Sequence, residues 1–249
     1  MSRIDDAFKK GKVLITYIMA GDPDLDKTYD IVLKLEKLGV GIIELGIPFS
    51  DPSADGSAIV RAGVRALQNN YAIEDYFKLI EKIRQASQIP LVIMCYANTV
   101  FTYGIDRFFA RLKAAGGDGV IIPDVPYEES EEFAPYAKSH GIDYIPLVSP
   151  ASKDRIEMIT KDATGFVYCI SSFGVTGVRD TIDHKIHKIY DAVKIPKAVG
   201  FGISKIEHIK ELSKYFDGII IGSKIVEFIE NNQYDEMEKF VKDAANALR

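Results

Sequence analysis

Two carboxylates in residues 43–56 are the side chains of this sequence best placed to do chemistry. Glu44 lies in an apolar run, and residues 42, 44 and 46 share one face of the strand predicted there. Burial on an apolar face raises the pKa of a carboxyl, which lets it hold or deliver a proton near neutral pH. Asp55 lies on the following loop, where wetter surroundings keep a carboxylate ionised. Two carboxyls with different pKa values favour proton-transfer chemistry, although structural networks and ordinary turns also contain such pairs.

The composition is that of a globular domain. The chain has 249 residues, of which 47% are hydrophobic and 27% charged, with no sharp change along its length, so we expect one domain over residues 1–249. No apolar run reaches the roughly 18 residues of a membrane span, and the charged start does not resemble a signal peptide. We therefore expect a cytoplasmic protein that does not bind membranes. A formal net charge of -5 without a long basic stripe predicts no binding to nucleic acid.

Strand-like and helix-like segments alternate, which predicts a parallel sheet. Eight Val- and Ile-rich runs are expected to be strands: residues 13–19, 41–46, 91–96, 119–124, 144–149, 166–171, 197–202 and 218–223. Eight strands with helical crossovers in this length predict an α/β fold, a single (β/α)8 TIM barrel. Ser2, Asp5, Ile4 and Phe8 predict an extra N-terminal helix that packs beneath the barrel. An open doubly wound sheet is the alternative, but the expected glycine fingerprint is missing after the first strand.

The barrel places both carboxylates and three glycine-bearing turns at one end. Chemistry in such barrels occurs at the carboxyl ends of the strands, where Glu44 and Asp55 fall. The turns at residues 173–177, 200–204 and 221–224 follow the last three predicted strands. Glycine permits close approach of the backbone, and the N–H groups at a helix start favour an anion. These turns therefore predict a phosphate site, to which Ser223 adds a hydroxyl donor.

Other types of catalytic site find little support in the sequence. The four histidines, His140, His184, His187 and His208, are expected in helices or at their ends without supporting ligands, so no metal site is predicted. Cys95 and Cys169 lie in separate apolar strands and are expected to be core thiols. Lys197 is at the wrong end of its strand for a Schiff base. The residues thus favour a metal-free mechanism without a Schiff base.

The motifs resemble those of the tryptophan synthase alpha subunit family. Its pattern Glu-x-Gly-x-Pro-Phe-Ser-Asp-Pro-x-Ala-Asp-Gly is matched from Glu44 to Gly56. Shorter matches occur at residues 21–23, 96–98, 124–126, 174–177 and 199–203, so the resemblance spans essentially the whole chain. It implies retro-aldol cleavage of indole-3-glycerol phosphate to indole and glyceraldehyde 3-phosphate, a step of tryptophan biosynthesis.

The resemblance also implies roles for individual residues. Glu44 moves protons, and Asp55 accepts a hydrogen bond from the indole N–H. The phosphate is held by Gly177, Gly202, Gly222 and Ser223. The indole pocket and its lid comprise Tyr17, Ile59, Met94, Tyr96, Tyr168, Thr176 and Phe201, of which Thr176 closes over the site. Tyr17 and Met94 also fit a plain barrel core.

The same resemblance implies a partner subunit. Family members work with a beta subunit that carries pyridoxal phosphate (PLP) and consumes the indole, usually as an α2β2 assembly, while the alpha subunit itself needs no cofactor. Residues 51–52 and 124–126 are expected docking surfaces. Ser57, Val60 and the pair Ser172 and Phe173 depart from the family's usual residues, which affects loop closure and communication with the partner. A stand-alone indole-releasing lyase, a metal-free phosphosugar isomerase and a mainly non-catalytic allosteric partner barrel remain as alternatives.

Overall fold

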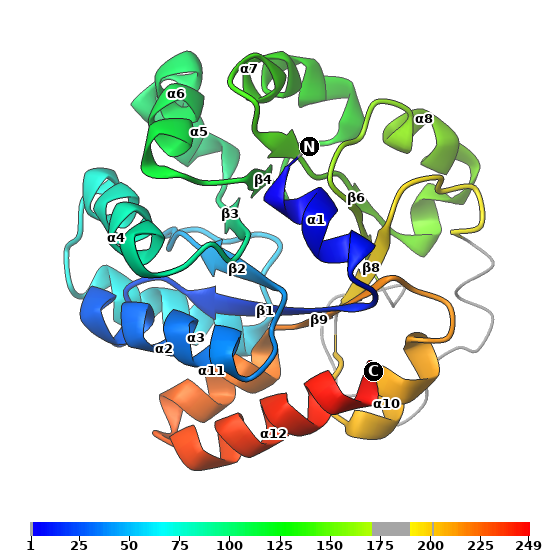
Figure 1. Ribbon diagram of the computed structural model, residues 1–249. Coiled ribbons are helices and arrows are strands. Elements are labelled where there is room, and N and C mark those ends of the chain that lie inside the picture. The colour runs from blue at the N-terminus through cyan, green and yellow to red at the C-terminus, as the bar shows by residue number, and fades with distance from the viewer. Residues whose placement is uncertain (1, 171–189, 201) are drawn as a thin grey trace.

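A computed structural model describes residues 2–170, 190–200 and 202–249. In this part of the chain, short parallel strands alternate with helices that surround them (Figure 1). The strands are β1 (Val13–Met19), β2 (Ile42–Gly46), β3 (Leu91–Met94), β4 (Gly119–Ile121), β5 (Asp143–Tyr144), β6 (Leu147–Val148), β7 (Val167–Ile170), β8 (Lys197–Gly200) and β9 (Gly218–Ile221).

The helices form the outer layer. Two short 3-10 segments lie one before β5 and one after β6. The α-helices are α1 (Arg3–Lys9), α2 (Leu25–Lys37), α3 (Ser57–Leu67), α4 (Ile73–Ala86), α5 (Ala97–Tyr103), α6 (Ile105–Ala115), α7 (Ala134–Ser139), α8 (Ile156–Thr160), α10 (Ile206–Leu212), α11 (Ser223–Glu230) and α12 (Tyr234–Ala247). The 3-10 segments are η1 (Tyr127–Glu132) and η2 (Pro150–Arg155). In α4 the apolar residues Phe77, Ile80 and Ile83 recur at a spacing of three and are buried on one face of the helix.

The sheet is parallel throughout and closes through one chain segment. Its order is β5-β4-β3-β2-β1-β9-β8-β7-β6, so its two edge strands are consecutive in sequence. Between them, the Ile145 N–H donates to the Val120 carbonyl over 2.9 Å, and the Tyr168 N–H donates to the Pro146 carbonyl over 3.0 Å. The segment therefore bonds to both edges, and the predicted TIM barrel is confirmed.

One predicted strand differs from the structure. Residues 144–149 were expected to form a single fifth strand, but β5 and β6 are two short strands that pair with β4 and β7 respectively. Pro146 lies between them, and proline has no N–H to donate to a sheet ladder. The chain therefore changes its partner strand at this point.

Alternation along the strands separates two cores. Odd-numbered residues of β1, such as Val13 and Ile15, face the barrel interior together with Ile42 and Val92. Intervening residues such as Leu14 and Ile18 pack against the surrounding helices. This period of two places every second strand residue inside the barrel.

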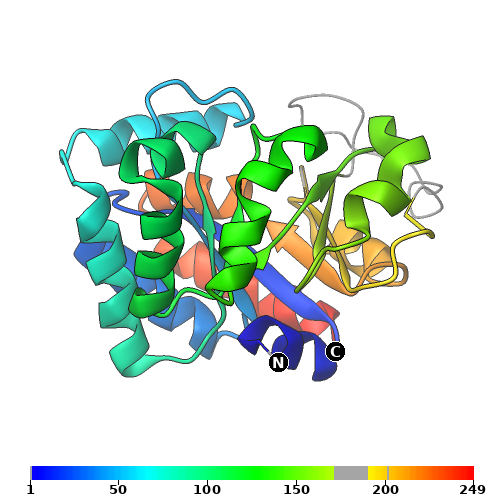
Figure 2. The ribbon, with the colours of Figure 1, turned by 90° about the horizontal axis from the view of Figure 1, so that it is seen from above.

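Helix α1 closes the amino-terminal end of the barrel, as predicted. Its capping box is formed: the Ser2 hydroxyl accepts from the Asp5 N–H, and the Asp5 carboxylate accepts from the Ser2 N–H. Ile4 is fully buried in the barrel interior, and the Phe8 ring lies 5.7 Å from that of Phe166. The loop after β2 lies at the opposite end (Figure 2), where the strands have their carboxyl ends.

Candidate active site

Glu44 is a fully buried carboxyl on the inner face of β2. Its neighbours in register are Tyr17 on β1 and Val92 on β3. The side chain is 0% exposed, and neither carboxyl oxygen has a hydrogen-bond partner within the described part of the chain. This burial raises the pKa of Glu44 from 4.5 to about 8. The carboxyl is therefore mainly protonated at neutral pH, and no described group accepts a hydrogen bond from it.

Asp55 lies on the loop that joins β2 to α3, two residues before that helix begins. It is half-buried, and this burial raises its pKa, while a hydrogen bond with the Tyr96 hydroxyl acts in the opposite direction. The same hydroxyl accepts the Ala54 N–H over 3.0 Å. The Phe49 ring stacks on Tyr96 with centroids 5.0 Å apart. Tyr96 thus fixes the loop that carries Asp55. As the sequence predicts, Asp55 is less buried than Glu44.

Two buried tyrosines lie close to these carboxyls. Tyr17 is 5% exposed and Tyr168 is 6% exposed. Burial is the largest cause that raises the pKa of both tyrosines; the charges of Asp55 and of Glu44, when these carboxyls are ionised, raise that of Tyr17 further, and the charge of Glu44 also raises that of Tyr168. Both tyrosines therefore keep their protons at neutral pH. The electrostatic coupling indicates that the predicted pocket residues Tyr17 and Tyr168 border the same site as the two carboxyls.

Glycines in the barrel wall make room for the two rings. A Cβ at Gly46 would overlap the hydroxyl end of Tyr17, and one at Gly200 would overlap the Tyr168 hydroxyl. Gly46 is the next inward-facing residue after Glu44, so the Tyr17 ring lies across β2 on the mouth side of Glu44. Neither Gly46 nor Gly200 was expected from the sequence to have a role, although the alternation that places Glu44 inside also places Gly46 there.

An apolar group of side chains continues from Tyr17 towards the helices at the mouth. Ile59 on α3 and Met94 on β3 pack in the same cluster as Tyr17. Met19, which the sequence analysis did not select, also belongs to it and shares the inner face of β1 with Tyr17. Of the residues that depart from the family pattern, Ser57 is the exposed first residue of α3 and Val60 is half-buried on the same helix.

The predicted phosphate residues are only partly described. Gly222 caps the start of α11, and Ser223 is the exposed first residue of that helix. A Cβ at Gly222 would lie 3.3 Å from the Tyr17 Cβ, so this helix start lies beside Tyr17. Gly202, after the neighbouring strand β8, is exposed with a φ of +71°. The predicted residues Gly177, Thr176 and Phe201 lie outside the described residues, as do Ser172 and Phe173. Phosphate binding therefore stays a prediction.

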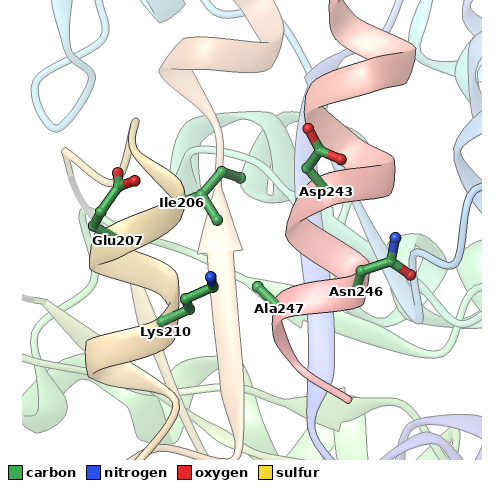
Figure 3. A pocket seen from close by; sticks show the side chains of 6 residues that line it. All are labelled: Ile206, Glu207, Lys210, Asp243, Asn246 and Ala247. Atoms are coloured by element: carbon green, nitrogen blue, oxygen red, sulfur yellow. The ribbon is translucent and has the colours of Figure 1, made fainter.

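Other parts of the described structure do not add to this site. Asp124, in a predicted docking segment, accepts the Ala97 N–H at the start of α5 over 2.9 Å. In the other predicted segment Asp51 is exposed and Pro52 half-buried. Cys95 and Cys169 are buried free thiols, as predicted. A hollow of about 420 Å³ between α10 and α12 (Figure 3) is lined by Ile206, Glu207, Lys210, Asp243, Asn246 and Ala247, and no described site residue borders it.

The described ranges contain neither a metal-binding cluster nor a helix that could cross a membrane. Within them, no group of three or more His, Cys, Asp and Glu side chains is arranged to hold a metal ion. His140 is paired with Asp106 over 2.8 Å, while His184 and His187 lie outside these ranges. Among the helices of the same ranges, none combines the length and the apolar character that crossing a membrane requires.

Comparison with known proteins identifies the family. Residues 5–248 match the sequence profile of the family described as tryptophan synthase alpha chain. Proteins of that name from a Thermoanaerobacter species and from Caldanaerobacter subterraneus are each 49% identical to this chain, over 259 and 253 residues. The alignments cover 100% and 99% of this chain, and 99% and 97% of the two relatives.

Solved structures agree with the sequence matches. The tryptophan synthase subunit alpha of Legionella pneumophila has a TM-score of 0.89 at 30% identity, with 100% of this chain and 98% of that chain covered. A chain of the tryptophan synthase α2β2 complex of Pyrococcus furiosus has a TM-score of 0.85 at 36% identity, with 96% and 98% covered. Because the family profile and full-length relatives span nearly all of it, the chain belongs to the tryptophan synthase alpha chain family, whose enzymes are lyases that cleave indole-3-glycerol phosphate.

Proposed function

We propose that Glu44 transfers the protons, and that the Asp55 carboxylate holds the indole N–H, in the reaction by which this lyase cleaves indole-3-glycerol phosphate. The observation that carries the proposal is Glu44, a carboxyl with 0% exposure, no described hydrogen-bond partner and a pKa raised to about 8. A buried acid of this kind holds its proton at neutral pH until a substrate atom accepts it.

The proposed reaction begins with protonation of the indole ring. Glu44 donates its proton to C3, and the ring becomes a cation whose N–H donates to the Asp55 carboxylate. The Glu44 carboxylate then accepts the proton of the glycerol hydroxyl next to the ring. The bond between C3 and the glycerol carbon breaks, its electron pair returns to the ring, and the hydroxyl carbon becomes the aldehyde. The products are indole and glyceraldehyde 3-phosphate, and Glu44 is protonated again.

The rest of the site orients the substrate. The indole ring lies among Tyr17, Ile59, Met94, Tyr96 and Tyr168, together with Phe201, in an apolar pocket that excludes water. At the other end of the substrate, the phosphate binds the start of α11 through Gly222 and Ser223, with Gly177 and Gly202. Thr176 belongs to the lid that closes over the site. The N–H groups of a helix start and the small glycines suit a phosphate group without an arginine.

The proposal extends to cofactor, partner and location. No step above uses a cofactor, so we propose that this chain needs none and that PLP is bound by a partner beta subunit. The Pyrococcus furiosus relative comes from an α2β2 complex, which supports a similar assembly here. In such an assembly the indole passes to the beta subunit in tryptophan biosynthesis. We place the enzyme in the cytoplasm.

Indole release from indole-3-glycerol phosphate tests the proposal. Glu44→Gln should lower the rate by about 10² to 10⁴, the usual contribution of a positioned acid or base. Asp55→Asn should lower it by about 10² to 10³, because the charge that stabilises the cationic ring is lost. Asp26→Asn is the matched control, because Asp26 is an exposed carboxylate that pairs with Lys82 on the outer helices. Each variant is assayed alone and with a PLP-dependent beta subunit, after circular dichroism has verified its fold.

The outcomes separate the alternatives. Indole release at the wild-type rate by either active-site variant contradicts the assignment of that carboxyl. Release by the wild type alone at a rate that the beta subunit does not change indicates a stand-alone lyase. No release by the wild type, alone or with the beta subunit, indicates a non-catalytic partner barrel. Isomerisation of a phosphosugar without release of indole indicates an isomerase.

A further inference from the structure

A cluster of ionic hydrogen bonds centred on Arg65 joins three elements at the mouth of the barrel. Arg65, on α3, donates from Nε and Nη2 to the two carboxylate oxygens of Asp22 over 2.8 and 2.7 Å. Asp22 lies in the loop after β1, and its side chain is only 3% exposed. Two parallel bonds between a guanidinium and a buried carboxylate fix distance and orientation together.

The same guanidinium also reaches α11. Arg65 Nη1 donates to Glu230 Oε1 over 2.8 Å, and Glu230 is the last residue of α11. Arg61, one turn earlier on α3, donates to both oxygens of Glu230 over 2.8 and 2.7 Å. Glu230 therefore accepts three charged N–H groups from α3, and Arg65 links it to the loop after β1. A network of several bidentate bonds holds its elements more firmly than an isolated surface pair.

Uncharged contacts join the same elements. Asn69, just past the end of α3, donates to the carbonyls of Gly21 and Pro23 over 2.9 and 2.7 Å. Between the helices, Met19 packs in an apolar cluster with residues of α3 and with Val226 of α11. A Cβ at Gly63 of α3 would lie 3.5 Å from the end of the Met19 side chain. Helices α3 and α11 therefore form one packed pair, and Figure 1 shows them side by side.

The two helices of this pair begin at different ends of the candidate active site, α3 near Asp55 and α11 at the predicted phosphate-binding residues. Helix α3 starts two residues after Asp55, and α11 starts with Ser223, next to Gly222. The Arg65 cluster joins the last turns of both helices. A change in how these last turns are held therefore changes how their first turns are placed relative to each other, because a short helix moves as a rigid rod.

We propose that Arg65 is a positioning residue that sets the separation between Asp55 and the phosphate-binding start of α11. This proposal rests on the function proposed above. The substrate spans both ends, with its indole at the carboxyls and its phosphate at Ser223, and its glycerol chain has a fixed reach. The Gly21-Asp22-Pro23 motif thereby gains a role, since Asp22 anchors the guanidinium that holds the two helices.

Arg65→Met tests the proposal, because methionine keeps part of the apolar stem and removes every hydrogen bond of the guanidinium. Misplacement of a substrate by about 1 Å can cost about 100-fold in rate. We expect kcat/KM for indole-3-glycerol phosphate to fall between about 10- and 100-fold, with a raised KM. The inhibition constant of inorganic phosphate should change by less than about twofold, because phosphate occupies only the end of the site at the start of α11. Arg65→Lys, which retains one charge without the planar fork, should recover part of the loss.

Arg111→Met is the matched control. Arg111 on α6 is similarly half-buried and also bonds two carboxylates, Glu74 over 3.0 Å and Glu81 over 2.7 Å, on the outer side of the barrel. Its loss should lower the thermal unfolding temperature and leave KM unchanged. If Arg65→Met does not fold, Glu230→Gln is used instead, because it weakens the link to α11 and leaves the Asp22 pair intact. That variant should show a smaller rise in KM.

Wild-type kcat/KM in the folded Arg65 variant overturns the proposal. So does a loss no larger than that of Arg111→Met, or an equal loss of phosphate affinity, since these would indicate general loosening. Failure of the underlying function would appear differently, as a wild-type chain that releases no indole.

Discussion

The pH dependence of stability offers a direct test of how Glu44 is held. Its side chain is 0% exposed, and burial raises its pKa from 4.5 to about 8. Glutamine has almost the same shape as a protonated glutamate but cannot ionise. Comparison of the wild type with Glu44→Gln therefore isolates the ionisation of this one side chain, since other titrating groups contribute equally to both proteins.

The sign follows from proton binding in the two states. Below pH 4.5 the Glu44 carboxyl is neutral in both the folded and the unfolded chain. The free energies of unfolding of the wild type and of Glu44→Gln therefore differ by a constant amount in this range. Between pH 4.5 and 8 the unfolded chain has lost this proton and the folded chain has kept it, so wild-type stability falls as pH rises. Above pH 8 the Glu44 carboxyl is ionised in both the folded and the unfolded chain. The difference in the free energy of unfolding between the two proteins is then constant again.

The magnitude follows from the same pKa values. The difference between 4.5 and about 8 is about 3.5, and one pKa unit is worth about 1.4 kcal/mol. We expect the free energy of unfolding of the wild type to fall by about 5 kcal/mol relative to Glu44→Gln across this window. The slope should be about 1.4 kcal/mol per pH unit.

Urea unfolding of both proteins at pH 5, 6, 7, 8 and 9 measures this difference. A difference that does not change with pH would refute the reasoning, because it would mean that Glu44 ionises in the folded protein as it does in water. Enzyme activity provides an independent check. Indole release that needs a protonated Glu44 should decline above about pH 8.

Three further substitutions test other parts of the structure. Tyr96→Phe removes the hydrogen bond that opposes the raised pKa of Asp55, so the acid limb of the pH–rate profile should move to higher pH; an unmoved limb contradicts this. Gly46→Ala places a methyl group against the Tyr17 hydroxyl and should cost about 1–3 kcal/mol in urea unfolding, less in a Tyr17→Leu background. Asp118→Asn weakens contacts to Arg84, Arg3 and the Leu91 N–H and should cost about 3 kcal/mol by thermal unfolding, whereas exposed Asp26→Asn should cost little.

The sequence was sufficient for the barrel and for the inward position of Glu44. Both depend on local periodicity: alternation within a strand selects a face, and alternation of strands with helices selects a parallel sheet. Residues 144–149 are the exception, because Pro146 splits the predicted strand into β5 and β6. The chain contained that signal, because proline cannot donate to a sheet ladder.

The contacts around the site were decided by tertiary structure. Arg65 bonds residues 43 and 165 positions away, and Gly46 accommodates a tyrosine from a different strand. No local pattern marks such pairs, because they depend on where the closed barrel brings distant segments together. The amino-acid sequence by itself determined that Glu44 and Asp55 lie at one end of a barrel. Only the packed structure decided how deeply Glu44 is buried, and therefore that its pKa reaches about 8, because burial depends on side chains from several strands.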